Sequence, residues 1–199
     1  MGNLKLTSSA FEDGGEIPRK YGYKNGNVSP PLTIDGISTE VKSLALIMDD
    51  PDAMDVVIDG EKPYTEPYVH WVVWNIRTDS KAEVDSGLYG NYYPTPTRIN
   101  IPESAGNIDV PMGSDARKFL SESGNSQGTT DFEEVGYGGP APPFKRHTYV
   151  FKLYALDIFT DSKGNPLLDV KHGASKADLE KAMEDHIIEQ TQLTGTYAP

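Results

Sequence analysis

The chain has 199 residues and no cysteine, which excludes disulfide frameworks, cysteine-ligated metal sites and thiol nucleophiles. Its 18 basic and 30 acidic residues give a formal net charge of −12, the opposite of the basic footprint of a nucleic-acid-binding protein, so we expect no nucleic-acid partner. The 19 glycines and 15 prolines together make up a larger fraction of the chain than the usual combined share of about 12%. This composition favours strands and turns over long helices.

The amino-terminal residues 1–11 lack a basic stretch followed by an apolar run. Apolar runs elsewhere are much shorter than the ~20 residues that cross a bilayer. The sequence therefore predicts a cytoplasmic protein without stable membrane anchoring. Its length is near that of one large domain, so we expect a single domain over residues 1–199.

Three segments carry strong strand patterns. Residues 43–48 form an apolar run that stops at Asp49, and residues 68–76 are rich in β-branched and aromatic side chains. Residues 147–156 alternate between two faces, with His147 and Phe151 on the same face. Weaker strands are expected over residues 4–8, 98–101 and 194–197.

One helix is predicted near the carboxyl terminus. Ser175 is a suitable N-cap, Asp178 follows three residues later as in a capping box, and Leu179 begins an apolar series that continues at helical spacing to Ile187. Gly195 lies beyond the expected end of this helix. A short helix or irregular turn is expected over residues 114–123, within a Gly/Pro/Ser/Asn-rich segment, residues 89–143, that we interpret as an ordered functional loop.

Chemically suggestive side chains lie at the ends of the predicted strands. Asp50 and Asp52 follow the first strong strand, His70 lies in the second, and His147 begins the third. The glycines and prolines of residues 138–143 allow a close, stiff backbone approach to a ligand. If folding brings these segments together, ring and loop N–H groups would hold a small anion such as phosphate or a carboxylate, while a carboxylate orients an imidazole.

Other interpretations of the same residues remain open. A single histidine in an apolar strand, such as His70 or His147, is more often a hydrogen-bonded core residue than a ligand contact. Asp50 and Asp52, with the proline between them, also suit an ordinary turn. A metal site from these aspartates and His70 lacks the further ligands of known motifs. No Gly-x-Ser-x-Gly elbow, phosphate loop or dinucleotide fingerprint occurs, which argues against a serine nucleophile, and we expect no metal and no cofactor.

Taken in order, these residues and their neighbours form a series of motifs that resembles the phosphatidylethanolamine-binding protein family, also called the Raf kinase inhibitor protein family, and in particular its bacterial and archaeal branch. The motifs lie at residues 17–21, 27–32, 50–53, 69–71, 137–143, 147–157 and 193–197. Each motif is weak alone, but their shared order makes the resemblance specific.

The resemblance implies a mainly β fold: two antiparallel sheets with Greek-key connections, a carboxyl-terminal helix and a few short helical turns. It also implies a non-catalytic protein with a pocket for phosphate or a phosphoryl headgroup. The residues that would line or support this pocket are Asp50, Asp52, His70, Gly138, Gly139, Pro140, His147 and Tyr149.

The sequence departs from the family pattern beside this pocket. Met54 stands where the family has a proline. Residues 55–67 form a longer segment than the link usual in the family. We interpret this segment as a lip over the pocket mouth, and the alternative is a plain surface hairpin. Two other functions stay open: inhibition of a kinase or serine protease through protein contact, and hydrolysis by an Asp/His pair.

Overall fold

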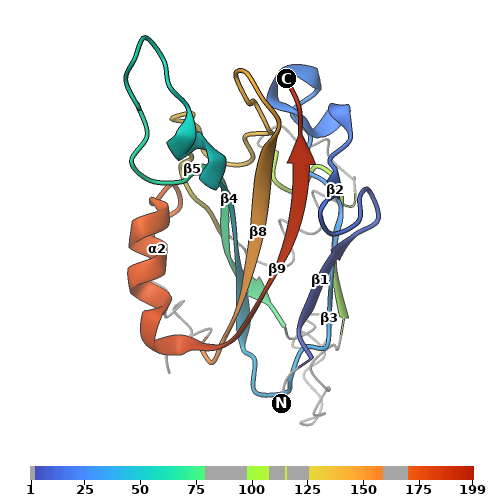
Figure 1. The fold of residues 1–199 in the computed structure, drawn as a ribbon. Coiled ribbons are helices and arrows are strands. Elements are labelled where there is room, and N and C mark those ends of the chain that lie inside the picture. Colours follow the sequence, from blue (N-terminus) through green and yellow to red (C-terminus); the bar gives the residue numbers. More distant parts are fainter. Residues whose placement is uncertain (1–2, 79–97, 108–114, 116–125, 159–169) are drawn as a thin grey trace, which may run out of the picture.

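The computed structural model describes residues 3–78, 98–107, 115, 126–158 and 170–199, and within these ranges the chain forms two β-sheets (Figure 1). The smaller sheet has the strand order β1 (Lys5–Ser8), β3 (Leu32–Asp35), β6 (Arg98–Ile101). The larger has the order β2 (Gly15–Glu16), β9 (Ile187–Tyr197), β8 (His147–Leu156), β4 (Ser43–Asp50), β5 (Tyr68–Arg77), β7 (Ser126–Gln127). The predicted mainly β, two-sheet fold is confirmed, although the short β2–β9 pair is parallel.

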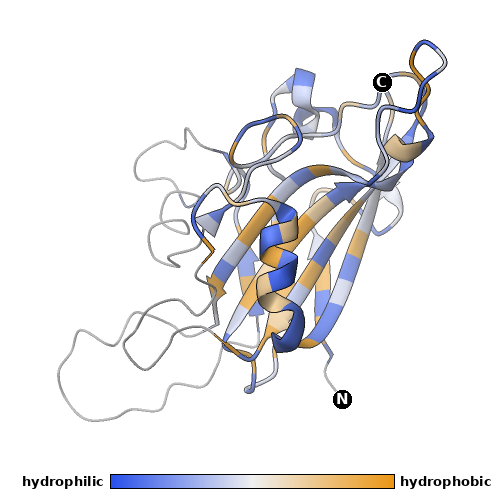
Figure 2. Cartoon of the chain, turned by 90° about the vertical axis from the view of Figure 1, so that its left-hand side faces the viewer, coloured by the Kyte–Doolittle hydropathy of each residue, from blue (hydrophilic) through white to orange (hydrophobic). Residues whose placement is uncertain are grey.

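The larger sheet is covered on both faces. Its inner face packs against the smaller sheet through a core that includes Leu46, Phe151 and Leu193. On the outer face, helix α2 (Lys176–Met183) crosses the strands (Figure 2) and buries Leu179 and Met183. This layering explains why every residue of β4 is buried, as expected for a continuous apolar run. In β8 the predicted alternation is confirmed by its burial pattern.

The strand β4 ends with two aspartates that face opposite layers. Strand side chains alternate between faces, so Asp50 follows Leu46 and Met48 of the inner core, whereas Asp49 follows Ile47 of the outer core. Both carboxylates are almost fully buried, and each has therefore acquired its own polar partners.

A β-bulge in β5 sets the position of His70. Met48 of β4 pairs with Trp71, but the next residue, Asp49, pairs with Val69, which leaves His70 as the extra residue on the bulged strand. A regular strand would place His70 and Trp71 on opposite faces. The bulge changes this alternation at the end of the sheet where β4 finishes and β8 begins.

Helix α2 begins as predicted but ends early. Ser175 and Asp178 form the expected capping box. The helix stops at Met183, and Ile187, expected on the helix, instead starts β9 and pairs with Leu156 of β8. The prediction was wrong at this end because an extensive antiparallel ladder with β8 outweighs a helical spacing that only three apolar residues supported.

The strand predicted over residues 98–101 occurs with those bounds as β6, the one predicted over residues 4–8 begins one residue later as β1, and β9 is much longer than residues 194–197. Strands β2, β3 and β7 were not predicted. The part of the chain that the structure describes also contains 3-10 turns at η1 (Arg19–Tyr21), η2 (Tyr23–Asn25), η3 (Pro51–Asp55) and η5 (Glu184–His186). The element expected over residues 114–123 lies almost wholly outside the described residues. None of the described helices has both the length and the apolar character needed to cross a bilayer.

A substitution of Gly195 can test how tightly the chain packs around β9. It does not follow a helix but lies inside β9, where an added Cβ would lie 2.6 Å from Ile17 Cγ1. We expect Gly195→Val to lower the free energy of unfolding by about 1–3 kcal/mol through overpacking, measured by urea denaturation. Gln192→Val on the exposed side of the same strand is the control and should change stability little. Equal effects of the two substitutions would contradict this packing.

Candidate functional site

Three strand ends converge on one cavity of about 190 Å³. Asp50 ends β4, His70 lies near the start of β5, and His147 begins β8. The convergence follows from the antiparallel pairing of β4 with both neighbours, because the end of β4 then lies beside the beginnings of β5 and β8. The cavity is lined by Asp50, Ala53, Val56, Ile58, Tyr64, Tyr68, His70, Phe132, Ala141, Pro143 and His147.

The best-defined polar contact in the cavity wall joins His147 to Asp50. Nδ1 of His147 donates to Oδ2 of Asp50 at 2.7 Å, and the His147 side chain is only 1% exposed. The other carboxylate oxygen, Oδ1 of Asp50, accepts the backbone N–H of Ala53 at the start of η3. The second ring nitrogen of His147, Nε2, is buried and has no hydrogen-bond partner among the described residues. A buried polar atom of this kind costs free energy unless a guest or water satisfies it.

His70 is fixed in a similar way by a backbone group. Its Nδ1 lies 2.7 Å from the carbonyl oxygen of Gly138. A carbonyl can only accept, so Nδ1 carries the proton and Nε2 is the ring atom available to the cavity. Rings of Tyr68, Phe132 and Tyr149 surround the imidazole at centroid distances of 5.3, 5.3 and 5.1 Å. Burial in this apolar enclosure lowers the pKa of His70, although the Gly138 carbonyl and the Asp50 charge oppose the shift.

The glycine corner supports the wall instead of donating to the cavity. The N–H of Gly138 donates to the carbonyl of His70, and the N–H of Gly139 donates to Oδ1 of Asn27 at 2.7 Å. A side chain at Gly139 would collide with the backbone oxygen of Tyr21. Internal partners therefore already use these two N–H groups, and neither is available to an anion in the cavity.

The other predicted site residues lie behind the cavity wall. Asp52 accepts the backbone N–H of Thr148 at 2.7 Å and so ties η3 to β8. The carbonyl of Pro140 accepts the N–H of Tyr23. Tyr149 packs beside His70, and burial, followed by the nearby Asp50 charge, raises the pKa of its phenol. The structure thus places Asp50, His70 and His147 at the cavity and the remaining predicted residues in its support.

The insertion at residues 55–67 contributes to the cavity and its mouth. Val56, Ile58 and Tyr64 line the cavity from this segment. Val57 and Ile58 are also 49% and 43% exposed, and Phe144, which follows the lining residue Pro143, is 71% exposed. Large apolar side chains next to the cavity-lining residues therefore remain in contact with water.

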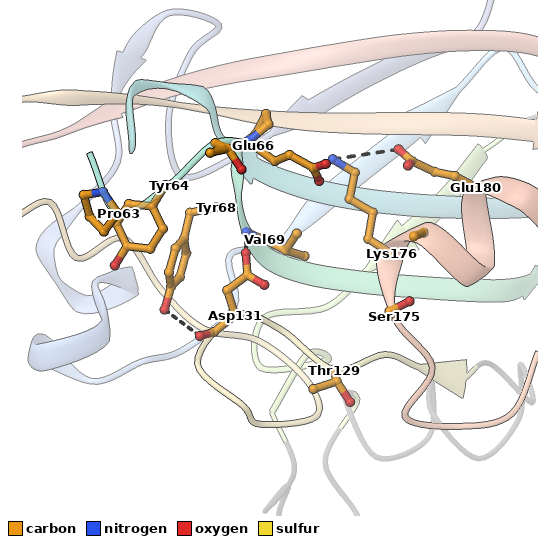
Figure 3. A pocket seen from close by; sticks show the side chains of 13 residues that line it. Pro63, Tyr64, Glu66, Tyr68, Val69, Thr129, Asp131, Ser175, Lys176 and Glu180 are labelled. Carbon is orange, nitrogen blue, oxygen red and sulfur yellow. Dashed lines mark hydrogen bonds and ion pairs between the residues drawn. The ribbon is translucent and has the colours of Figure 1, made fainter. Parts of the chain in front are cut away.

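A neighbouring pocket of about 500 Å³ shares Tyr64 and Tyr68 with the cavity (Figure 3). Several of its polar groups have partners within the protein. The hydroxyl of Tyr68 donates to the carbonyl of Asp131, whose carboxylate accepts the N–H of Val69, and burial raises the pKa of Tyr68 to about 12. This pocket is therefore a weaker candidate for ligand binding than the cavity with the unpartnered His147 nitrogen.

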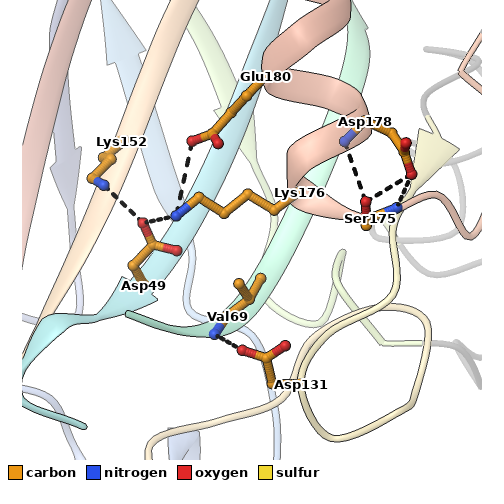
Figure 4. A network of polar contacts seen from close by, with 8 residues as sticks. All are labelled: Asp49, Val69, Asp131, Lys152, Ser175, Lys176, Asp178 and Glu180. Carbon is orange, nitrogen blue, oxygen red and sulfur yellow. Dashed lines mark hydrogen bonds and ion pairs between the residues drawn. The ribbon is translucent and has the colours of Figure 1, made fainter. Parts of the chain in front are cut away.

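Asp49, the other aspartate at the end of β4, belongs to a separate polar network (Figure 4). Its Oδ2 accepts from Lys152 at 2.7 Å and from Lys176 of α2 at 2.9 Å. Lys176 also lies 3.8 Å from Glu180. The ion pair between Lys176 and Asp49 attaches α2 to the sheet. Asp50 is then the β4 carboxylate that lines the cavity.

Among the residues that the structure describes, no three histidine or acidic side chains gather in a way that could hold a metal ion. Asp52, one of the side chains considered for such a site, accepts the backbone N–H of Thr148 at its Oδ2.

Sequence reasoning missed the aromatic part of the site. Phe132, Tyr64 and Tyr68 line the cavity, and Phe132 also stacks on Tyr23 with ring centroids 4.2 Å apart. These residues lie in loops or at the edge of a strand, where aromatic side chains have many roles. Asn27, which holds Gly139, has a left-handed backbone with φ of 51°. The only sequence signal for Asn27 was its position in the family-like motif at residues 27–32.

Comparisons with known proteins identify the family and agree with the fold. Residues 7–198 match the family model described as phosphatidylethanolamine-binding protein. The chain is 37% identical over 194 residues to the UPF0098 protein of Methanothermobacter thermautotrophicus, covering 98% of both chains. It is similar to a crystal structure of a phosphatidylethanolamine-binding protein homolog from Chlamydia trachomatis, with 31% identity, a TM-score of 0.66 and coverage of 99% and 98%. The E. coli YbcL structure shares the fold at 24% identity, with a TM-score of 0.67 and coverage of 98% and 97%.

The lowered pKa of His70 predicts a pH-dependent stability. The unfolded chain binds a proton at this residue near the ordinary pKa of about 6.5, whereas the folded protein resists protonation until lower pH. The free energy of unfolding is therefore highest above about pH 6.5 and falls, by at most about 1.4 kcal/mol per pH unit, as the pH drops towards the lowered folded-state pKa. Urea denaturation between pH 7.5 and 5 measures this slope.

The matched comparison uses two histidine variants. His70→Gln should remove this component of the slope, whereas His186→Gln, at an exposed ion pair with Asp157, should retain it. A His70→Gln protein with the same slope as the unmodified chain would contradict the assigned burial effect.

Proposed function

The chain belongs to the phosphatidylethanolamine-binding protein family, and we propose that it is a binding protein whose cavity takes a phosphate or phosphoryl group without catalysing a reaction. Proteins of this family are generally binding proteins. The finer assignment to a phosphoryl group rests on the chemistry of the cavity.

The observation that carries the proposal is the unpartnered Nε2 of His147. It is buried, belongs to a residue that lines the cavity, and is part of an imidazole oriented by Asp50. Native proteins rarely leave such an atom without a partner. His70 lines the same cavity, and a phosphoryl group offers several oxygen atoms around one centre to the two imidazoles.

The size of the cavity supports a small guest or the end of a larger one. Its volume of about 190 Å³ is below the range of about 300–1,000 Å³ typical of pockets that enclose drug-sized ligands. A phosphoryl group fits within such a volume, whereas a larger attached group would have to remain outside the cavity.

Long-range electrostatics do not assist the capture of an anion. The net charge of −12 repels anions in solution, and Asp50 adds negative charge in the cavity wall. Affinity must therefore come from short-range hydrogen bonds, which salt screens less than it screens interactions between surface charges. Because the N–H groups of Gly138 and Gly139 are already used, the imidazoles carry most of this role.

The variant His147→Asn tests the role of Nε2. The asparagine amide can still donate to Asp50 from the position of Nδ1, but it has no atom at the position of Nε2. Loss of a hydrogen bond to a charged guest, about 1.5–3 kcal/mol, should weaken the binding of inorganic phosphate by roughly 10- to 100-fold in isothermal titration calorimetry.

Two controls accompany this measurement. His186→Asn, which alters an exposed histidine paired with Asp157, should keep the phosphate affinity, and thermal unfolding should show that His147→Asn is folded. Unchanged phosphate affinity in a folded His147→Asn protein would contradict the proposed function.

A second candidate function is inhibition of a kinase or serine protease by contact. The exposed apolar side chains Val57, Ile58 and Phe144 support it, since they lie at or next to cavity-lining residues in the sequence and such residues are typical of interaction surfaces. In an inhibition assay against a panel of kinases and serine proteases, Phe144→Ser should weaken any inhibition while leaving phosphate binding unchanged. Equal inhibition by the variant would exclude this surface from the contact.

A further inference from the structure

The pocket of about 500 Å³ beside α2, here called the second pocket, has no part in the proposed function (Figure 3). Its walls come from three segments that are far apart in the sequence, within residues 63–69, 129–131 and 175–180. The volume lies in the range of about 300–1,000 Å³ that is typical of pockets for ligands. The side chains of its walls therefore indicate which guest it suits.

The charged side chains of the second pocket are mainly acidic. Three carboxylates line it, those of Glu66, Asp131 and Glu180, against one ammonium group, that of Lys176. This ammonium lies 2.9 Å from the buried carboxylate of Asp49, so it already has an anionic partner outside the pocket lining. A guest in the pocket would meet an excess of negative charge.

The three carboxylates keep unused capacity to accept hydrogen bonds. Within the described part of the chain, the carboxylate of Glu66 has no partner. Asp131 uses Oδ2 for the backbone N–H of Val69, at 2.7 Å. Glu180 lies 3.8 Å from Lys176, which is a long contact for an ion pair. A cationic guest would therefore gain carboxylate partners without breaking a strong internal contact.

The rest of the wall favours a flat, extended cation. Tyr64 and Tyr68 line the pocket with ring centroids 5.1 Å apart, and Pro63 and Pro67 flank them. An arginine guanidinium stacks on tyrosine rings and offers five N–H donors in one plane to carboxylates. The acidic side chains of the described residues do not gather closely enough to hold a metal ion, so a larger cation fits them better.

An anion is a poor guest for this pocket. The amino-terminal end of α2 lies in its wall, but a capping box already occupies that end. The carboxylate of Asp178 accepts the N–H of Ser175, and the hydroxyl of Ser175 accepts the N–H of Asp178. The charge of Asp178 also offsets the positive end of the helix dipole.

The insertion that forms one wall also offers a surface for a longer guest. Residues 58–61 form a tight hairpin whose first and last residues exchange two backbone hydrogen bonds of 2.9 Å. The exposed apolar side chains Val57 and Ile58 lie in the same insertion. Residues 55–67 contain four acidic residues and one basic residue. This surface suits a polypeptide in which apolar residues flank a basic one, and the net charge of −12 attracts such a partner over long range.

We propose that the second pocket is a docking site for an arginine side chain of a partner polypeptide. The guanidinium pairs with the carboxylates of Glu66 and Glu180 and lies against the ring of Tyr64. Apolar neighbours of this arginine contact Val57 and Ile58. The inference goes beyond the proposed function, because it concerns a different pocket and a different guest and holds whether or not the cavity binds phosphate.

The test is an NMR titration of the ¹⁵N-labelled protein at constant ionic strength with three probes. These are the blocked pentapeptide Gly-Leu-Arg-Leu-Gly, the same peptide with citrulline in place of arginine, and spermidine. We expect the arginine peptide to shift amide resonances within residues 63–69, 129–131 and 175–180. It should bind at least about fivefold more tightly than the citrulline peptide, which keeps the shape of arginine but lacks its charge.

Two double variants separate the pocket from the overall charge. Glu66→Gln with Glu180→Gln should weaken binding of the arginine peptide at least about threefold, because two exposed ion pairs are lost. Glu12→Gln with Glu40→Gln removes the same charge at exposed residues outside the pocket and should leave the affinity unchanged. Thermal unfolding shows whether both variants are folded.

Each contrary result has a definite meaning. Equal weakening by the two double variants would show that only net charge matters and would overturn the docking site. Equal affinity for the arginine and citrulline peptides, or shifts confined to residues outside the pocket, would also overturn it. Spermidine binding at the same residues as tightly as the arginine peptide would overturn the assignment to a polypeptide. Phosphate affinity of the unmodified protein tests the proposed function separately.

Discussion

The hydrogen bond between His147 and Asp50 is the contact on which the candidate site depends. Both side chains are buried, and together they join the end of β4 to the beginning of β8. A carboxylate and an imidazole in this environment are stable only if each has a partner. The same bond fixes the ring orientation and leaves Nε2 as the atom that needs a guest.

The surrounding structure keeps this geometry rigid. The β5 bulge brings His70 to the same end of the sheet, and the Gly138 carbonyl holds its ring. Asp49 is turned to the outer face, where two lysines neutralise it. Asp52 and the glycine N–H groups hold backbone segments together and do not contact the cavity. Few donors are therefore left for a guest, and this shortage separates the site from an ordinary anion pocket.

Much of this arrangement was predictable where a local pattern has one dominant cause. The alternation in β8 and the capping box at Ser175 follow from the sequence, and the motif order indicated Asp50, His70 and His147. The bulge at His70 was not predictable, because it depends on the register with β4. The early end of α2 likewise depends on pairing with β8, and the use of the glycine N–H groups depends on Asn27, which is remote in sequence.

The most direct measurement of the central claim is the protonation pattern of the two cavity histidines, read from ¹⁵N NMR of the imidazole nitrogens near pH 7.5. We expect both rings to carry a proton on Nδ1, and added phosphate to shift the Nε2 resonance of His147. Absence of a proton from Nδ1 of His147 in the free protein, or an Nε2 resonance that phosphate leaves unchanged, would contradict the account.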